Sequence, residues 1–253
     1  MKRNLNRLIG FAVGATDGEI GKIKEVYFDD ATWTIRYFIV ETGNWLVGRK
    51  VLISPEAALV PNWEEGILPV DLTKEQVKNS PDIDTEQPVS RQQEIALYAH
   101  YPWTSYWGAG SLWGGGMGTS GMVGPAYESI EEAVEKEKAL VPAENNTDPH
   151  LRSSRRVTGY QLDETDGQIG EVADFIIDEN TWKIEFLVVD TGAWFSGDKV
   201  LVSPEWIKEI NWETSSLKVR VSKEQIKNSP EYDDSKPFNE SYAAALSDYY
   251  QAK

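Results

Sequence analysis

Apolar and polar residues alternate along several short stretches of this chain, which predicts β-strands rather than long helices. The clearest stretch is 34–40, where alternation gives way to the apolar run Phe38, Ile39 and Val40. Alternation is typical of a strand with one buried face, whereas a short apolar run indicates a strand covered on both faces. The candidate strands of the first half are 8–13, 20–28, 34–40, 50–53, 57–63 and 68–72. About six short strands in a stretch of this size favour a small barrel or sandwich.

The same pattern occurs twice in the chain. Residues 8–101 align with residues 157–250 at a constant offset of 149 without a gap, and about 38 of the 94 pairs are identical. The shared strings are TDG-x-IG from Thr16, T-W-x-I from Thr32, TG-x-W from Thr42, KVL-x-SPE from Lys50, NWE from Asn62 and KEQ-x-KNSP from Lys74. A gapless copy of this length is a whole module with its own core, because a fragment would leave unpaired strand edges. The chain therefore contains two similar β-rich units.

An Asp-Gly pair separates the first two candidate strands of each copy, at Asp17 and at Asp166. This dipeptide suits the positive φ angles of a tight hairpin turn. Both aspartates are therefore interpreted as turn formers, and a ligand-binding role is the less favoured alternative.

Helix signals follow the strands. Thr73 and Ser222 are each followed three residues later by Gln, the capping-box spacing that predicts a short helical turn at the end of each barrel. A second helix is predicted at 91–101 and at 240–250. The second of these has one apolar stripe, formed by Tyr242, Ala245, Leu246 and Tyr249. Docking of this stripe on the chain's own barrel is favoured over docking on a partner.

The ordered set of motifs resembles the PRC-barrel family, which is named from the H subunit of the photosynthetic reaction centre and also contains a ribosome maturation factor. Residues 8–84 and 157–233 carry the resemblance. It implies a mainly β fold of two repeated small PRC-type β-barrels, about six short strands each, with short flanking helices. It also implies a role in assembling proteins, with no shared catalytic residues, and the chain is most similar to stand-alone bacterial members. We expect no counterpart of the membrane segment of the H subunit or of the extra N-terminal domain of the maturation factor.

The predicted domains are a first barrel with its following helix at 1–101, a Gly- and aromatic-rich linker with one helix at 102–156, and a second barrel with a C-terminal helix at 157–253. The linker helix is expected at 129–140. A flexible tether is the favoured interpretation of the Gly-rich part. The alternative is that its aromatic residues bind a partner or fill the groove between the barrels. The candidate partner-binding residues are Trp103, Tyr106, Trp107 and Trp113.

Composition narrows the classes of function. The formal net charge of −16 disfavours nucleic acid and favours a basic protein partner. The chain has no cysteine and only two histidines, His100 and His150, which excludes disulfides, thiolate chemistry and histidine-rich metal sites. No apolar stretch is long enough to span a membrane, and the start lacks the apolar run of a signal peptide, so a cytoplasmic protein is expected.

Catalytic patterns are missing from the sequence. The acidic pairs Asp29-Asp30, Asp178-Glu179 and Asp233-Asp234 match no calcium loop and are interpreted as solvated turn charges. No serine-elbow or phosphate-binding loop is present. We therefore expect no catalytic residues, no cofactor and no metal.

Two functions remain as hypotheses. The first is a non-enzymatic interaction or scaffold protein in which two barrels form a pseudo-twofold pair, as a monomer or as a homodimer. The alternative is a module that binds a small ligand or polysaccharide through some of its ten tryptophans. Residues that both copies share are expected to serve the fold, because both copies must form it.

Overall fold

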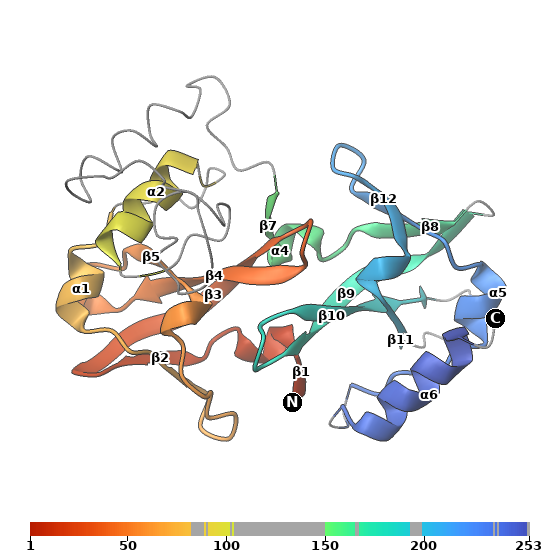
Figure 1. Ribbon diagram of the computed structural model, residues 1–253, viewed down its shortest axis with the longest axis horizontal. Helices are drawn as coiled ribbons and strands as arrows, with labels where there is room; N and C mark the ends of the chain where they lie inside the picture. Colours follow the sequence, from red (N-terminus) through yellow and green to blue (C-terminus); the bar gives the residue numbers. More distant parts are fainter. Residues whose placement is uncertain are drawn as a thin grey trace, which may run out of the picture.

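The computed structural model describes residues 1–81, 89, 91–101, 103, 150–164, 167–192, 199–234, 236 and 238–251. The predicted linker helix at 129–140 lies outside these residues. The first copy occupies one half of the molecule and the second copy the other (Figure 1), and each is built on one twisted sheet. The fold is thus mainly β with short helices, as the sequence predicts.

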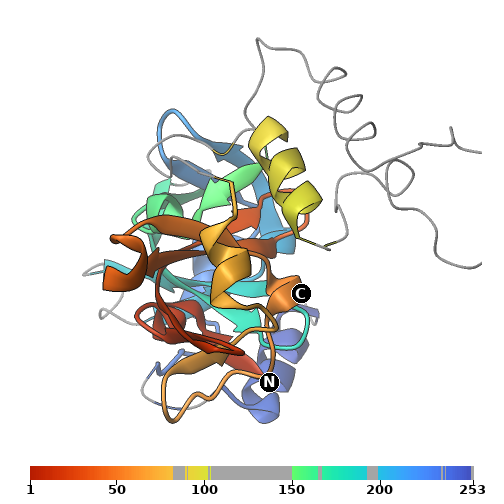
Figure 2. The same ribbon diagram turned by 90° about the vertical axis from the view of Figure 1, so that its left-hand side faces the viewer.

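The sheet of the first copy has six strands in the order β5-β4-β3-β2-β6, with β7 added beside β3. The bounds of these strands are β2 (Ala12–Ala15), β3 (Gly18–Asp29), β4 (Thr34–Thr42), β5 (Lys50–Ile53), β6 (Ile67–Pro69) and β7 (Leu151–Ser153). Short helical elements connect or cover them: η1 (Leu5–Leu8), η2 (Asn44–Leu46), η3 (Pro55–Ala57), α1 (Lys74–Lys78) and α2 (Arg91–His100). Figure 2, which views this copy end-on, shows α1 and α2 on the outside of the strands.

The sheet of the second copy has seven strands in the order β11-β10-β9-β8-β13-β12, with β1 added beside β9. The bounds are β1 (Lys2–Asn4), β8 (Gln161–Glu164), β9 (Gly167–Asp178), β10 (Ile184–Asp190), β11 (Lys199–Val202), β12 (Ile207–Asn211) and β13 (Ser216–Val219). Its helical elements are α4 (Ser154–Val157), η6 (Pro204–Trp206), α5 (Lys223–Lys227) and α6 (Glu240–Gln251). Both sheets therefore share one topology, including the parallel pairs β2–β6 and β8–β13.

The two sheets exchange a strand. β1 at the start of the first copy pairs with β9 of the second copy, and β7 at the start of the second copy pairs with β3 of the first. The registers are equivalent, since Lys2 faces Asp178 as Leu151 faces Asp29. The structural repeat thus begins at β1 and β7, ahead of the aligned sequences, and the copies form a pseudo-twofold pair.

The exchange joins the copies into one hydrophobic core. Buried side chains of both copies belong to a single cluster. Phe28 of β3 and Phe175 of β9 are in contact, with ring centroids 5.8 Å apart. Phe38 of β4 meets the ring of Trp182 edge-on at 4.9 Å. Separate cores, one in each copy, do not describe this molecule.

The two glycines of the shared motif TDG-x-IG are required for different structural reasons. Gly18 has φ of 137° in the hairpin turn, which only glycine adopts readily. Gly21 has ordinary φ, but a Cβ there would collide with the backbone carbonyl of Glu41 on β4, and Gly170 lies against Asp190 in the same way. The second glycine therefore permits close approach of two strands.

The predicted helices that fall within the described residues are confirmed. Thr73 and Ser222 form complete capping boxes at the starts of α1 and α5. In α6, Leu246 is buried in a small cluster with β9, β10 and β11, and Tyr242 packs against that cluster. The helix thus docks on its own barrel, although Ala245 of the predicted stripe is exposed. Tyr249 of α6 donates a hydrogen bond to the carbonyl of Gln225, at the position where His100 of α2 meets Gln76.

Two strand predictions are wrong in part. Residues 57–63 form only isolated bridges at Ala58 and Asn62, although the second copy has the regular strand β12 there. Pro61 has no amide hydrogen to donate to a ladder, and its counterpart in β12 is Ile210. Of the predicted strand at 8–13, only the part from Ala12 onward is a strand. The 3-10 helix η1 ends at Leu8, and Gly10 then has φ of 93°, which is not a strand conformation.

Candidate functional site

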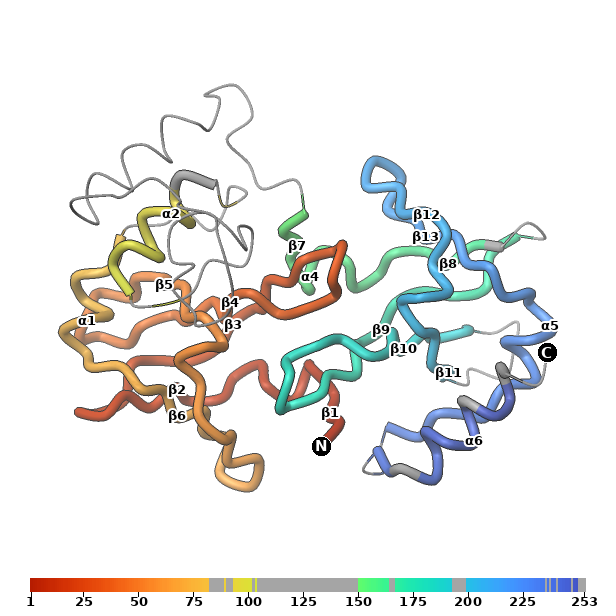
Figure 3. Tube along the Cα trace, viewed as in Figure 1, coloured from red at the N-terminus to blue at the C-terminus, as the bar shows by residue number. Residues whose placement is uncertain are grey.

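The turns of the two long hairpins meet at the pseudo-twofold axis, in the middle of the molecule (Figure 3). The amide of Ile35 donates to the carbonyl of Trp182 at 2.9 Å, and the amide of Ile184 donates to the carbonyl of Trp33 at 2.7 Å. Both tryptophans have φ of 56° and are nearly fully buried. Left-handed backbone is unfavourable for a residue with a large side chain, so packing and the reciprocal bonds must hold it.

One acidic residue of the first hairpin binds the strand that the second copy contributes. Asp30 Oδ2 accepts from Nε of Arg152 at 2.7 Å, and Asp30 Oδ1 lies 2.8 Å from Nδ1 of His150. The guanidinium of Arg152 in turn lies 4.0 Å from the ring centroid of Trp212. A carboxylate, a guanidinium and an indole thus join β7 to both copies.

The equivalent group joins β1 to the second copy. Glu179 takes the place of Asp30, and its carboxylate contacts the amino group of Met1 at 3.2 Å and Nε of Arg3 at 3.6 Å. Trp63 Nε1 donates to Glu179 Oε2 at 2.5 Å, and Arg3 lies over the Trp63 ring at 5.2 Å. We call the two groups the Asp30 clasp (Asp30, His150, Arg152, Trp212) and the Glu179 clasp (Glu179, Met1, Arg3, Trp63).

The clasps correct the interpretation of the pairs Asp29-Asp30 and Asp178-Glu179 as solvated turn charges. The third pair, Asp233-Asp234, is exposed and contacts Lys236 and Lys199. Asp29 is buried and its Oδ1 accepts from the amides of Ala31 and Thr32, as Asp178 accepts from Asn180 and Thr181. The second acids of the two corrected pairs, Asp30 and Glu179, contact the exchanged strands. Sequence reasoning missed this because the basic partners lie at the start of the other copy, far from the acids along the chain. The invariant position of the tryptophan in NWE was the one available signal.

A further carboxylate holds the exchanged strand β1. Asp174 of β9 accepts from Asn4 Nδ2 at 3.0 Å and from the amide of Asn6 at 3.1 Å. Its counterpart in the first copy, Glu25, accepts a hydrogen bond from Ser153 of β7. Burial raises the pKa of Asp174 above its ordinary value, and the hydrogen bonds from Asn4, Phe175 and Asn6 oppose part of that rise.

The raised pKa of Asp174 predicts a pH-dependent contribution to stability. The folded state binds the proton more tightly than the unfolded state, so this group favours folding below its ordinary pKa and loses that effect as pH rises through the folded pKa. The free energy of unfolding of the wild type, relative to Asp174→Asn, is expected to fall as pH rises from 3 to 7. Urea unfolding of both proteins across that range measures it. A difference that stays constant or grows with pH would contradict the assignment.

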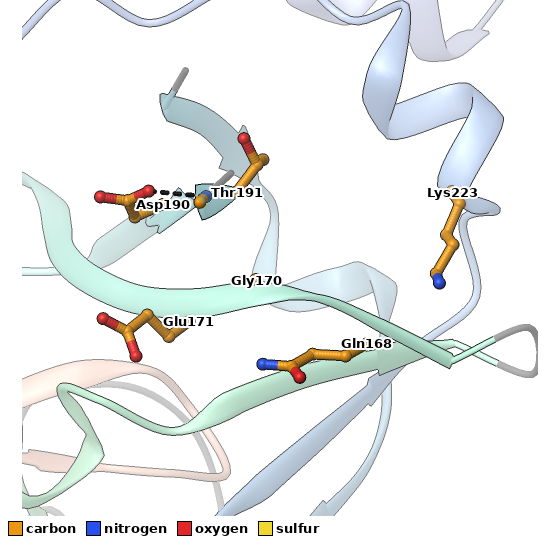
Figure 4. A pocket seen from close by; sticks show the side chains of 7 residues that line it. Gln168, Gly170, Glu171, Asp190, Thr191 and Lys223 are labelled. Carbon is orange, nitrogen blue, oxygen red and sulfur yellow. Dashed lines mark hydrogen bonds between the residues drawn. The ribbon is translucent and has the colours of Figure 1, made fainter. Parts of the chain in front are cut away.

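A pocket of about 600 Å³ lies beside β9 and α5 of the second copy (Figure 4). Gln168, Glu171, Asp190 and Lys223 supply its charged and polar lining. In the first copy the equivalent place holds the indole of Trp45, whose Nε1 donates to the carbonyl of Ile20 and whose ring lies 4.7 Å from Nζ of Lys74. The equivalent tryptophan, Trp194, lies outside the described residues, so this pocket carries no assignment.

A second pocket, of about 390 Å³, lies at the junction of the two copies. The first hairpin turn contributes Ala31, Thr32 and Trp33 to it. The second copy contributes Lys183, Ile184, Glu185, Ser203, Pro204, Glu205, Ile207 and Arg220. This junction pocket is built entirely of described residues and is lined largely by polar atoms.

Of the residues predicted to bind a partner, only Trp103 is described. It is 6% exposed and stacks on Tyr101 at 4.0 Å, with Tyr98 edge-on at 6.0 Å. Trp103 thus belongs to the core of the first copy. Tyr106, Trp107 and Trp113 lie outside the described residues.

The described residues show no metal-binding group, since no three His, Asp or Glu side chains come together among them. The two histidines make different contacts. His100 lies at the contact between α1 and α2, and His150 belongs to the Asp30 clasp. None of the helices in the described part of the chain is long and apolar enough to cross a membrane.

Comparison with known proteins agrees with the duplication. The family model described as "PRC-barrel domain" matches residues 2–77 and 162–226, which together are more than half of the chain. An uncharacterized protein of Deinococcus radiodurans is 30% identical over 81 residues, which are 32% of this chain and 29% of that relative. The chain thus spans less than a third of that relative's length.

Proposed function

Because the chain belongs to the PRC-barrel family, we propose that it is a non-enzymatic interaction or scaffold protein in which two PRC-barrels act as one rigid platform. The observation that supports this most is the reciprocal exchange of β1 and β7. Exchange and a shared core fix the two barrels relative to each other. A partner that contacts both barrels would then meet a preformed surface, which lowers the entropic cost of binding.

The use of the titratable groups also supports a role without catalysis. Several acids at equivalent positions of the two copies cap turns or clasp the exchanged strands, as Asp29, Asp30 and Glu179 do. Groups already bound to structural partners are poorly placed to serve as an acid, a base or a nucleophile.

The two barrels differ where a partner could tell them apart. In the first copy Leu59 is 53% exposed and Val60 is 84% exposed, whereas their counterparts in the second copy are Lys208 and Glu209. Exposed apolar side chains next to an acidic surface suit a partner with apolar and basic residues. The aromatic residues Tyr106, Trp107 and Trp113 are proposed as a second contact.

The tryptophans give less support to a polysaccharide-binding module. Among the described tryptophans none is exposed, and Trp63, Trp212 and Trp45 are engaged by basic side chains. Stacking on a sugar ring needs an open aromatic face, and the described tryptophans are all buried or partly buried.

The proposal predicts that a specific protein binds the intact chain and that binding depends on the features that distinguish the copies. Affinity capture from the native lysate would compare three baits: the intact chain, a chain with residues 104–126 replaced by a Gly-Ser tether, and Leu59→Lys/Val60→Glu. The double variant carries the residues of the second copy at equivalent positions, so it is expected to fold. Trp103 is retained in all three because it is buried.

We expect one protein to be enriched by the intact chain and reduced at least about tenfold by one of the two altered baits. Purified partner and chain should then bind with an affinity that falls as salt rises, because the surface is acidic. An unrelated bait of equal charge serves as the background control. If the intact chain captures no protein that this control does not also capture, a scaffold role is contradicted.

A further inference from the structure

The junction pocket holds basic groups that the fold itself does not require. We propose that it binds a small oxyanion ligand, of the phosphate class, through Lys183 and Arg220. This site is separate from the protein-binding surfaces proposed above, since it lies where the first hairpin turn meets β10, η6 and the end of β13.

The charges that face the pocket favour an anion. Lys183 and Arg220 have no ion pair or side-chain hydrogen bond within the part of the chain that the structure describes. Of the two acids in the lining, Glu185 pairs with Lys2 at 3.6 Å. Glu205 is the other, and it is exposed. Two uncompensated cations therefore face one exposed carboxylate, in a protein whose formal charge is −16.

The second observation comes from the equivalent positions of the other copy. The counterparts of Lys183 and Arg220 are Thr34 and Asp71, although both copies form the same strands around them. A residue needed only for the barrel would be expected in both copies. The two cations are thus specific to one side of the pseudo-twofold axis, as a single binding site would be.

The remaining lining suits an oxyanion as well. Ser203 accepts a hydrogen bond from the amide of Glu205, which leaves its hydroxyl hydrogen for a ligand. A guanidinium matches the geometry of phosphate oxygens, and an ammonium adds a point charge. The volume of about 390 Å³ lies within the range of small-molecule sites, so it accommodates a phosphate with an organic group attached.

Titration calorimetry of the full chain with inorganic phosphate tests the proposal. We expect binding by the wild type and a loss of affinity of about tenfold or more in Lys183→Thr and in Arg220→Asp, because each removes a charged hydrogen-bond donor. Both substitutions install the residue that the other copy has, so the fold is expected to survive, which circular dichroism checks. Amide chemical shifts should move at residues 183, 203, 205 and 220.

Arg155→Asn is the matched control for charge. Arg155 is exposed on α4, away from the pocket lining, and its counterpart in the first copy is Asn6. It removes one positive charge, as Lys183→Thr does, and should leave phosphate affinity within about twofold of the wild type. The proposal is overturned if the wild type does not bind phosphate, or if Arg155→Asn weakens binding as much as Lys183→Thr.

Discussion

Replacing Phe28 by alanine is expected to lower the free energy of unfolding of the whole chain by about 3–5 kcal/mol. Both copies are expected to be destabilised together, because they unfold as one unit. The side chain is fully buried and contacts Trp33 in its own copy and Phe175 in the other. Removal of the ring leaves a cavity at the place where the copies meet. Urea unfolding followed by tryptophan fluorescence and by far-ultraviolet circular dichroism should therefore show a single transition at lower urea.

Leu59→Ala is the control for this prediction. Leu59 is an apolar residue of the first copy that is largely exposed, so its truncation should change stability by no more than about 0.5 kcal/mol. Two separate transitions in Phe28→Ala, with only the earlier one shifted, would mean that the copies unfold independently and would contradict the shared core.

Trp33 combines burial with an unfavourable backbone, and the two effects can be separated. Trp33→Ala is expected to destabilise by about 3–5 kcal/mol, since it removes the indole that stacks on Phe28 and retains a Cβ at φ of 56°. Trp33→Gly should destabilise by about 1 kcal/mol less than alanine, because glycine relieves the left-handed strain. Thermal and urea unfolding of the three proteins measure both numbers.

Ser215 provides the matched control for strain. It has φ of 54°, its counterpart in the first copy is Gly66, and its side chain is not buried in the core. Ser215→Gly is therefore expected to stabilise the chain by about 1 kcal/mol. If Trp33→Gly is as destabilising as Trp33→Ala while Ser215→Gly is stabilising, the strain at Trp33 does not contribute as we describe.

Local signals in the sequence predicted much of the fold. Strands β3, β4 and β5 follow from alternation and apolar runs, and the capping boxes mark α1 and α5. These features depend on neighbours within a few residues, so a single sequence carries the information. The duplication then extends each assignment to the second copy.

The strand exchange could not be predicted in this way. β1 and β7 are only three residues each, and their sequences, KRN and LRS, share a single arginine. Pairing of Arg3 with Glu179, and of Arg152 with Asp30, joins residues that are more than about 100 positions apart in the sequence. Without coordinates, the acidic pairs were indistinguishable from solvated turns.

For Trp33 and Trp182, the sequence predicts the structural role but not the backbone conformation. Their occurrence in both copies predicted a structural role, and the burial of both agrees with it. Their left-handed backbone was not predictable, because a position of this kind normally carries glycine or asparagine. The reciprocal bonds to Ile35 and Ile184 across the pseudo-twofold axis explain why tryptophan is tolerated.

The two copies form one body through exchanged strands and a common core. The direct test is to place a specific protease site between residues 104 and 149, cut the chain there, and measure the mass in solution by sedimentation without denaturant. The two fragments are expected to remain together as one species with the mass of the whole chain. Separation into two folded halves under the same conditions would contradict the account.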